Sequence, residues 1–158
     1  TAMPTTLSPQ DIAKAFDEIR ASLGPSFRLD EEGSCLVSYK DSLPVLIQYI
    51  EQDQRLVFAS ELVAGLADAP ESEWLRLLSV DWLGFRSKGC ALTPDFKSGT
   101  VLLWRDARLD RPTGECLEAE LASFIREVLE ARDRLASERN EEPANNEISS
   151  IPATAQWA

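Results

Sequence analysis

The acidic residues are the first group in the sequence that could carry out chemistry. Asp30, Glu31 and Glu32 are consecutive, and neighbouring carboxylates can bind a cation or act as a general acid–base pair. The run ends at Gly33 between two strand-like segments, where acidic residues more simply keep a hairpin turn solvated. We therefore expect a turn here and not a catalytic pair.

A further carboxylate, that of Asp81, lies in an apolar stretch of the sequence. A carboxyl group in apolar surroundings can have a raised pKa and take a functional role. The simpler alternative is that Asp81 lies at the rim of a helix, in contact with water.

The usual nucleophile schemes and metal sites have few residues to draw on. The chain has no histidine, which removes the commonest general base and metal ligand. Its three cysteines, Cys35, Cys90 and Cys116, are far apart and form no Cys-x-x-Cys pair, so neither a disulfide framework nor a zinc site is indicated. No phosphate-binding loop or dinucleotide fingerprint occurs among the 7 glycines. We expect a protein without catalytic residues, metal or cofactor, in a reducing cytoplasm.

Length and charge narrow the class of partner. The 158 residues suit one domain, and 16 Lys and Arg against 27 Asp and Glu give a net charge of −11. Nucleic-acid phosphates and anionic membranes would repel such a surface. No apolar run approaches the roughly 20 residues of a membrane span. We expect a soluble domain that binds neither nucleic acid nor membrane, and whose partners are neutral or basic proteins.

The first half of the chain predicts a helix followed by strands. Ser8 is an expected N-cap with Pro9 at the first helical position, and Gly24 ends the helix. Alternating apolar residues and turn formers then predict strands. These are two short strands around Gly33 within 27–39, a third at 45–50 and a fourth at 55–59.

The second half predicts a helix at 71–83, strands at 88–93 and 100–105, and a long amphipathic helix after residue 113. The expected fold is α+β, an antiparallel five- or six-stranded twisted sheet with three helices in the order α-β-β-β-(β)-α-β-β-α. Residues 7–139 would form one domain. We expect residues 1–6 to be a disordered N-terminus or cloning scar, and residues 140–158 a disordered tail.

The second predicted helix is apolar on more than one side. A surface helix needs only one apolar stripe, so this helix should be buried on two sides. One side can pack on its own sheet, and a second copy in a two-fold dimer would cover the other. Complete enclosure within a monomer is the alternative. The apolar residues are Trp74, Leu75, Leu77, Leu78, Val80, Trp82 and Leu83.

A sheet with helices on one face leaves its edges and part of its other face open. Such a surface can accept an extended peptide by strand addition. The alternative for each candidate is that it fills the core. The candidates are Leu36, Leu46, Ile50, Leu56 and Phe58.

Together, this element order, the size, the acidity and the missing catalytic set resemble the class I type III secretion chaperones, the CesT-like Tir chaperone family. The likeness covers about residues 7–139. The segments that carry it are 27–37, 44–49, 55–58, 74–78 and 99–104.

The resemblance implies a bacterial cytoplasmic homodimer that catalyses nothing. It implies that a non-globular effector segment wraps around both subunits and stays soluble and secretion-competent without ATP. The implied partners are a cognate secreted effector, a second copy of the chain and, as a further candidate, the ATPase of the secretion apparatus. Matching positions give Leu75, Leu78, Trp82, Leu92 and Val101 as dimer candidates. They give Ile12, Phe16, Leu36, Leu46 and Phe58 as effector contacts.

Two features depart from the family pattern: four strand-like segments precede the second helix, and the tail beyond Asn140 has no clear counterpart. Two other functions stay open. An acidic immunity or antitoxin-like inhibitor of a basic protein would bind a folded partner. A small enzyme that uses carboxylates would show a deep pocket with perturbed acids.

Overall fold

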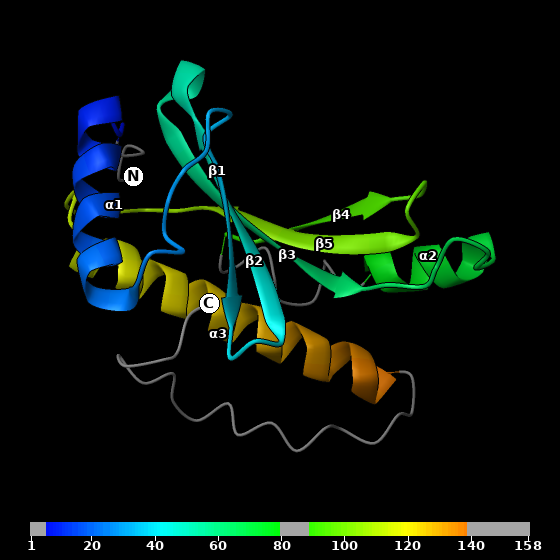
Figure 1. Cartoon of the computed structure of the whole chain (residues 1–158). Coiled ribbons are helices and arrows are strands. Elements are labelled where there is room, and N and C mark those ends of the chain that lie inside the picture. The colour runs from blue at the N-terminus through cyan, green and yellow to red at the C-terminus, as the bar shows by residue number, and fades with distance from the viewer. Residues whose placement is uncertain (1–5, 80–88, 139–158) are drawn as a thin grey trace.

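The computed structural model describes residues 6–79 and 89–138, and these contain three helices and five strands. Figure 1 shows the helices around a twisted sheet. A short 3-10 turn, Glu51–Asp53, joins β2 to β3. The helices are α1 (Pro9–Leu23), α2 (Glu71–Ser79) and α3 (Gly114–Glu138), and the strands are β1 (Ser34–Tyr39), β2 (Leu43–Ile50), β3 (Arg55–Val63), β4 (Ala91–Asp95) and β5 (Thr100–Asp106).

All neighbouring strands are antiparallel, and their order across the sheet is β1-β2-β3-β5-β4. The chain passes through α2 between β3 and β4, and β5 then returns to lie beside β3. The pairing of β3 with β5 shifts between Glu61 and Val63, where β3 departs from regular register. The predicted α+β class with an antiparallel sheet is confirmed, with five strands in the described ranges.

One face of the sheet is covered by α1 and α3, while α2 lies at the far end beside the β4–β5 turn (Figure 1). Phe58 of β3 meets Phe124 of α3 with ring centroids 5.6 Å apart. The covered face also holds one ion pair, between Arg105 of β5 and Glu120 of α3 at 3.3 Å. The apolar stripe of α3 that packs here is Leu117, Leu121, Phe124, Ile125, Val128, Ala131 and Leu135.

The first helix forms where its terminal residues predict it. Ser8 and Asp11 make a reciprocal capping box, with two backbone-to-side-chain hydrogen bonds of 3.1 Å. Gly24, whose φ is 118°, ends the helix and donates its N–H to the carbonyl of Arg20. Four residues at helical spacing are buried: Ile12, Ala15, Phe16 and Ile19.

The predicted first strand of the 27–39 hairpin is wrong. Residues 27–30 are extended but belong to no strand, because Asp30 turns the chain before a ladder can form. Its Oδ1 atom accepts the N–H groups of Glu32 and Ser34, both at 2.9 Å. The backbone bond from the Asp30 N–H to the Ser34 carbonyl, 2.9 Å, is the one ladder-like contact printed between the two arms. Three strands therefore precede α2, which removes one departure from the family pattern.

The boundaries of other elements also shift. The third strand runs to Val63, so residues 62–63, expected in a loop, are strand. The strand predicted at 88–93 occupies 91–95. The second helix is described to Ser79, and its predicted remainder at 80–83, with Asp81 and Trp82, lies outside the described residues.

Candidate functional site

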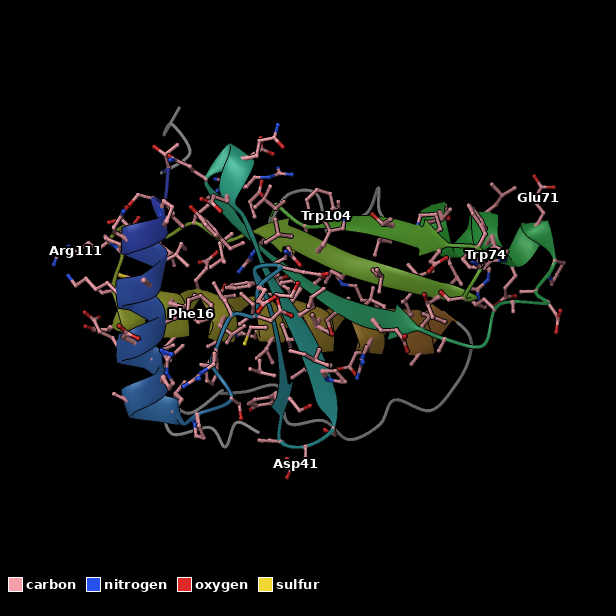
Figure 2. All side chains as sticks on the ribbon, turned by 45° about the horizontal axis from the view of Figure 1, so that its top comes forward. Phe16, Asp41, Glu71, Trp74, Trp104 and Arg111 are labelled. Atoms are coloured by element: carbon pink, nitrogen blue, oxygen red, sulfur yellow. The ribbon has the colours of Figure 1, made fainter. Side chains whose placement is uncertain are left out.

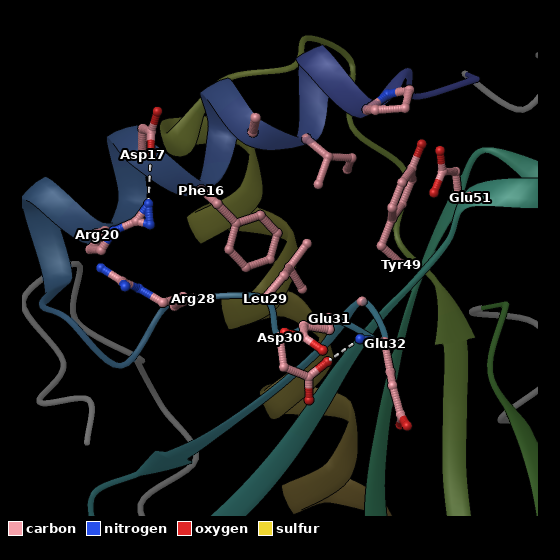
Figure 3. A pocket seen from close by; sticks show the side chains of 14 residues that line it. Phe16, Asp17, Arg20, Arg28, Leu29, Asp30, Glu31, Glu32, Tyr49 and Glu51 are labelled. Atoms are coloured by element: carbon pink, nitrogen blue, oxygen red, sulfur yellow. Dashed lines mark hydrogen bonds and ion pairs between the residues drawn. The ribbon is translucent and has the colours of Figure 1, made fainter.

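A groove of about 460 Å³ lies between α1 and the turn that precedes β1. Figure 3 shows the side chains that surround it. Residues of α1 form one wall, the segment 28–33 forms the other, and the end of β2 closes one end. The lining residues are Pro9, Ile12, Ala13, Phe16, Asp17, Arg20, Arg28, Leu29, Asp30, Glu31, Glu32, Gly33, Tyr49 and Glu51.

The floor of the groove is apolar. Ile12 and Phe16 are one helical turn apart on α1, so their side chains lie on one face of the helix. Leu29 faces Phe16 from the opposite wall (Figure 3), and it packs on the core without being fully buried. The exposed Pro9 and Ala13 form the outer part of the helical wall. An apolar side chain that entered the groove would lose contact with water against these residues, which favours binding.

Two contacts hold the α1 wall in place. The Tyr49 hydroxyl on β2 donates a 2.6 Å hydrogen bond to the carbonyl of Leu7, just before the helix. The Leu7 N–H in turn donates to the carbonyl of Gln54 at 2.9 Å. Burial, together with the negative charges of Glu51 and Asp11, raises the pKa of Tyr49. The hydroxyl therefore remains a proton donor to Leu7 at neutral pH.

The opposite wall depends on Gly33. Its φ is 78°, and a Cβ atom at this position would lie 2.7 Å from the carbonyl oxygen of Tyr49. Only glycine allows both this backbone conformation and this close approach. The Tyr49 N–H donates to the Gly33 carbonyl at 2.8 Å, and the Gln48 side-chain amide donates to the carbonyl of Glu32 at 2.9 Å. The acidic turn is thus tied to the end of β2.

Carboxylates line the groove without the geometry of a metal site. Asp30 uses one oxygen to accept backbone N–H groups of its own turn. In residues 6–79 and 89–138, no group of three His, Cys, Asp or Glu side chains is arranged to hold a metal ion. The arrangement suits binding of an apolar chain segment with charged neighbours.

A second surface lies on the sheet face opposite α1 and α3. Leu36 of β1 is directly opposite Leu46 of β2, and their side chains are 66% and 38% exposed. The same register places Ala59, Trp104 and Ala91 next in line on β3, β5 and β4. These three are half-buried, and Figure 2 shows Trp104 on the side of the sheet away from α3. We call these five residues the outer row.

The edge of β1 is part of this second surface. Gly33 and Tyr49 are a hydrogen-bonded pair, and such pairs alternate along an antiparallel ladder. The backbone groups of Leu36 and Ser38 therefore point away from β2. Within the described ranges β1 is the last strand on this side, so its edge can accept a further strand.

A third surface surrounds α2. Leu75 is 60% exposed, and Phe96 in the β4–β5 turn is 63% exposed. The ring of Trp74 packs on that of Phe96 with centroids 4.8 Å apart, and Figure 2 shows Trp74 at this end of the sheet. Leu78 is half-buried beside them. Large exposed apolar side chains that gather in this way are typical of protein interfaces.

The predicted site residues fall in four places. Ile12 and Phe16 come together in the groove, while Leu36, Leu46 and Ile50 point to the outer face of the sheet. Leu56, Phe58 and Val101 are in the core and reach no surface of the protomer, which is the alternative that the sequence left open. Leu75 and Leu78 are on α2, Leu92 is half-buried on β4, and Trp82 lies outside the described residues.

Sequence reasoning missed Leu29, Tyr49 and Ala13 in the groove and Trp104 in the outer row. Trp104 had a signal, because it alternates with the inward-facing Leu103 on β5. Leu29 had none, since its partner Phe16 is 13 positions away in a different element.

The fold and these surfaces define a small α+β binding protein whose groove and apolar faces suit another polypeptide. The comparisons with known proteins specify its class. The family model described as the Tir chaperone protein (CesT) family matches residues 15–132. Because the match covers most of the chain, the chain belongs to the Tir chaperone protein (CesT) family.

Two solved structures have the same fold. A chain from the structure described as "Crystal Structure of the ExsC-ExsE Complex" is 21% identical with a TM-score of 0.63, over 82% of this chain and 95% of that one. A chain from "Structure of the HopA1-SchA Chaperone-Effector Complex" is 19% identical with a TM-score of 0.55, over 75% of this chain and 90% of that one. No curated protein is a significant match to the sequence. None of the helices in the described ranges is both long and apolar enough to cross a membrane.

Proposed function

We propose that this protein is a bacterial cytoplasmic chaperone that binds the non-globular chaperone-binding segment of a secreted effector and keeps it soluble and competent for type III secretion. Membership of the Tir chaperone family supports this class of function. The observation that carries the proposal is the groove between α1 and residues 28–33, with Ile12, Phe16 and Leu29 as its apolar floor.

The mechanism is binding alone, without ATP. A non-globular segment loses conformational entropy when it is ordered on a surface, so it needs a large apolar area in return. The groove, the outer row and the free edge of β1 together offer apolar contacts and unpaired backbone groups. A segment held there cannot complete its own core, and its folding is deferred until release.

We further propose that two copies associate through α2. Leu75 and Phe96 expose apolar surface in one protomer, and Trp74 and Leu78 lie beside them. A two-fold dimer would bury this patch against its own copy. Each dimer would then present two grooves to one effector segment, and docking to the ATPase of the secretion apparatus would follow as a separate step.

The experiment is co-expression of the chain with N-terminal segments of proteins that the host secretes. We expect at least one segment to be soluble only with the chain and to co-purify with it. Ala13→Trp fills the groove from an exposed position, so it should abolish this effect without loss of the fold. Gln10→Trp places the same side chain on α1 outside the groove and should have no effect.

Other results would contradict the proposal. If no secreted segment is solubilised, the chaperone function is wrong. If a segment binds equally well to Ala13→Trp, the groove is not its site. Binding of a folded basic protein in place of an unfolded segment would favour the acidic inhibitor instead.

A further inference from the structure

The charges around the groove are separated along its length, and this inference rests on the proposed function of the groove as a site for a client segment. Arg20 and Arg28 lie together where α1 ends (Figure 3). Glu51 lies beside Tyr49 at the opposite end, near the start of α1, and Glu31 and Glu32 line the turn next to it. The apolar floor is between them.

The basic end has one guanidinium available for a client. Arg20 is held by Asp17 at 2.6 Å, so its charge is largely compensated within α1. Arg28 is exposed and forms no ion pair with any residue in 6–79 or 89–138. A client carboxylate at this end would therefore meet Arg28.

The acidic end has three carboxylates available. Glu31, Glu32 and Glu51 are exposed, and none forms an ion pair within the described part of the chain. Asp30 differs, because its carboxylate accepts two backbone N–H groups of the turn. The Gln48 side chain fixes the backbone at Glu32, so these charges are presented on an ordered turn.

The dipole of α1 has the opposite sense, since its positive end is at Pro9, near Glu51. It amounts to about half a charge at each end and falls off within one turn. At this end the capping carboxylate of Asp11 already offsets it. Three side-chain carboxylates outweigh the remainder, so the groove is negative at the Glu51 end.

We propose that the groove selects client segments in which basic residues follow an apolar stretch on one side only, and that the pairing of these residues with Glu31, Glu32 and Glu51 fixes the direction in which the client enters. The apolar stretch lies on Ile12, Phe16 and Leu29. A client that entered in the reverse direction would place its basic residues against Arg28 and leave the three carboxylates unpaired. The charges act at the rim, in contact with water, so the preference is moderate and sensitive to salt.

The test uses three fluorescent peptides of about nine residues with the same apolar centre. One carries two lysines before the centre, one carries two lysines after it, and one has the two lysines of the better binder replaced by glutamates. Fluorescence anisotropy gives their Kd values for the intact protein. We expect one lysine peptide to bind about three- to tenfold more tightly than the other, and the glutamate peptide to bind least. The differences should shrink in 0.5 M salt, where screening is strong over distances beyond about 4 Å.

A charge-reversal variant shows which residues are responsible. Combined Glu31→Lys, Glu32→Lys and Glu51→Lys should invert the preference, so that the glutamate peptide binds best. Combined Asp41→Lys, Asp68→Lys and Asp110→Lys changes the net charge equally at exposed positions outside the groove, and it should keep the order of the wild type. Equal changes in both variants would mean that net charge alone acts, which would overturn the inference.

The outcomes for this inference and for the proposed function can be told apart. Equal affinity of the wild-type protein for all three peptides, with binding lost in Ala13→Trp, would overturn the charge selection and leave the groove as the client site. Failure of all three peptides to bind would overturn both, because the groove would then not be a peptide site.

Discussion

Glu18 on α1 accepts a 2.7 Å hydrogen bond from the backbone N–H of Gly114, the first residue of α3. The carboxylate thus satisfies one of the free N–H groups at the start of α3 and lies at the positive end of its dipole. A Cβ atom on Gly114 would lie 2.6 Å from the Cβ atom of Glu18 and 2.7 Å from the backbone nitrogen of Ile19. This contact sets how closely the helix that forms the groove wall lies against α3.

Gly114→Ala should therefore separate the two helices. Alanine normally favours a helix over glycine by about 1 kcal/mol, but the added methyl group would overlap backbone atoms of α1 that cannot move alone. We expect the free energy of unfolding to fall by about 1–3 kcal/mol, measured by urea denaturation. Ala119→Ser adds one atom at an exposed site of the same helix and should change little. Equal stability of Gly114→Ala and the wild type would mean that the helices adjust without cost.

Tyr49 should make stability depend on alkaline pH. Its pKa is raised in the folded protein, mainly by burial, so the folded state holds the phenol proton more tightly than the unfolded chain. The resulting stabilisation is complete below the unfolded pKa of about 10 and is lost as the pH rises through the folded value. Tyr49→Phe removes the donor to the Leu7 carbonyl and should lower the free energy of unfolding by about 1 kcal/mol at pH 8.

The difference between the wild type and Tyr49→Phe should narrow from pH 8 to pH 11, because only the wild type loses the hydrogen bond by ionisation. Urea denaturation of both proteins at each pH gives this difference, and the titration of all other groups cancels. A constant difference over that range would contradict the raised pKa of Tyr49.

Leu75→Glu should dissociate the proposed dimer without unfolding the protomer. Leu75 is 60% exposed in one chain, so a carboxylate there disturbs little of the fold, whereas two buried carboxylates across a two-fold axis would oppose association. Light scattering at several concentrations should give twice the 17.5 kDa chain mass for the wild type and the single mass for the variant. Ala119→Glu makes the same charge change on α3 and should leave the dimer intact. A wild-type protein that is monomeric at all concentrations would contradict the α2 interface.

Local signals in the sequence accounted for much of the fold. Ser8, Pro9 and Gly24 predicted both ends of α1, since helix capping depends on a few adjacent residues. The alternation of β1 and β5 predicted which of their side chains face the core. The strand expected at 27–30 failed for a reason that is also local but finer, because the Asp30 side chain competes with the ladder for backbone N–H groups.

The site was less predictable because it depends on contacts between distant segments. Phe16 and Leu29 face each other only after the turn at Gly33 docks on Tyr49. Phe58 alternates like a surface candidate, yet it is buried against Phe124, more than 60 positions later in the sequence. A period of two gives the two faces of a strand but not which face the helices will cover.

The outer row should be a client surface that contributes little to the stability of the chaperone itself. Leu36→Thr combined with Leu46→Thr keeps residues suited to strands and removes one exposed cross-strand pair. The free energy of unfolding should fall by no more than about 1 kcal/mol, because such pairs contribute about 0.2–1 kcal/mol. Binding of a co-purified effector segment should weaken about tenfold or more, since two leucine side chains would lose apolar contacts. The nine-residue peptides that occupy only the groove should bind as before. Leu75→Thr, which removes an exposed leucine from α2, is the matched control, and calorimetric titration gives the affinities. An unchanged affinity for the long segment in the double variant would restrict the client to the groove and exclude the outer row.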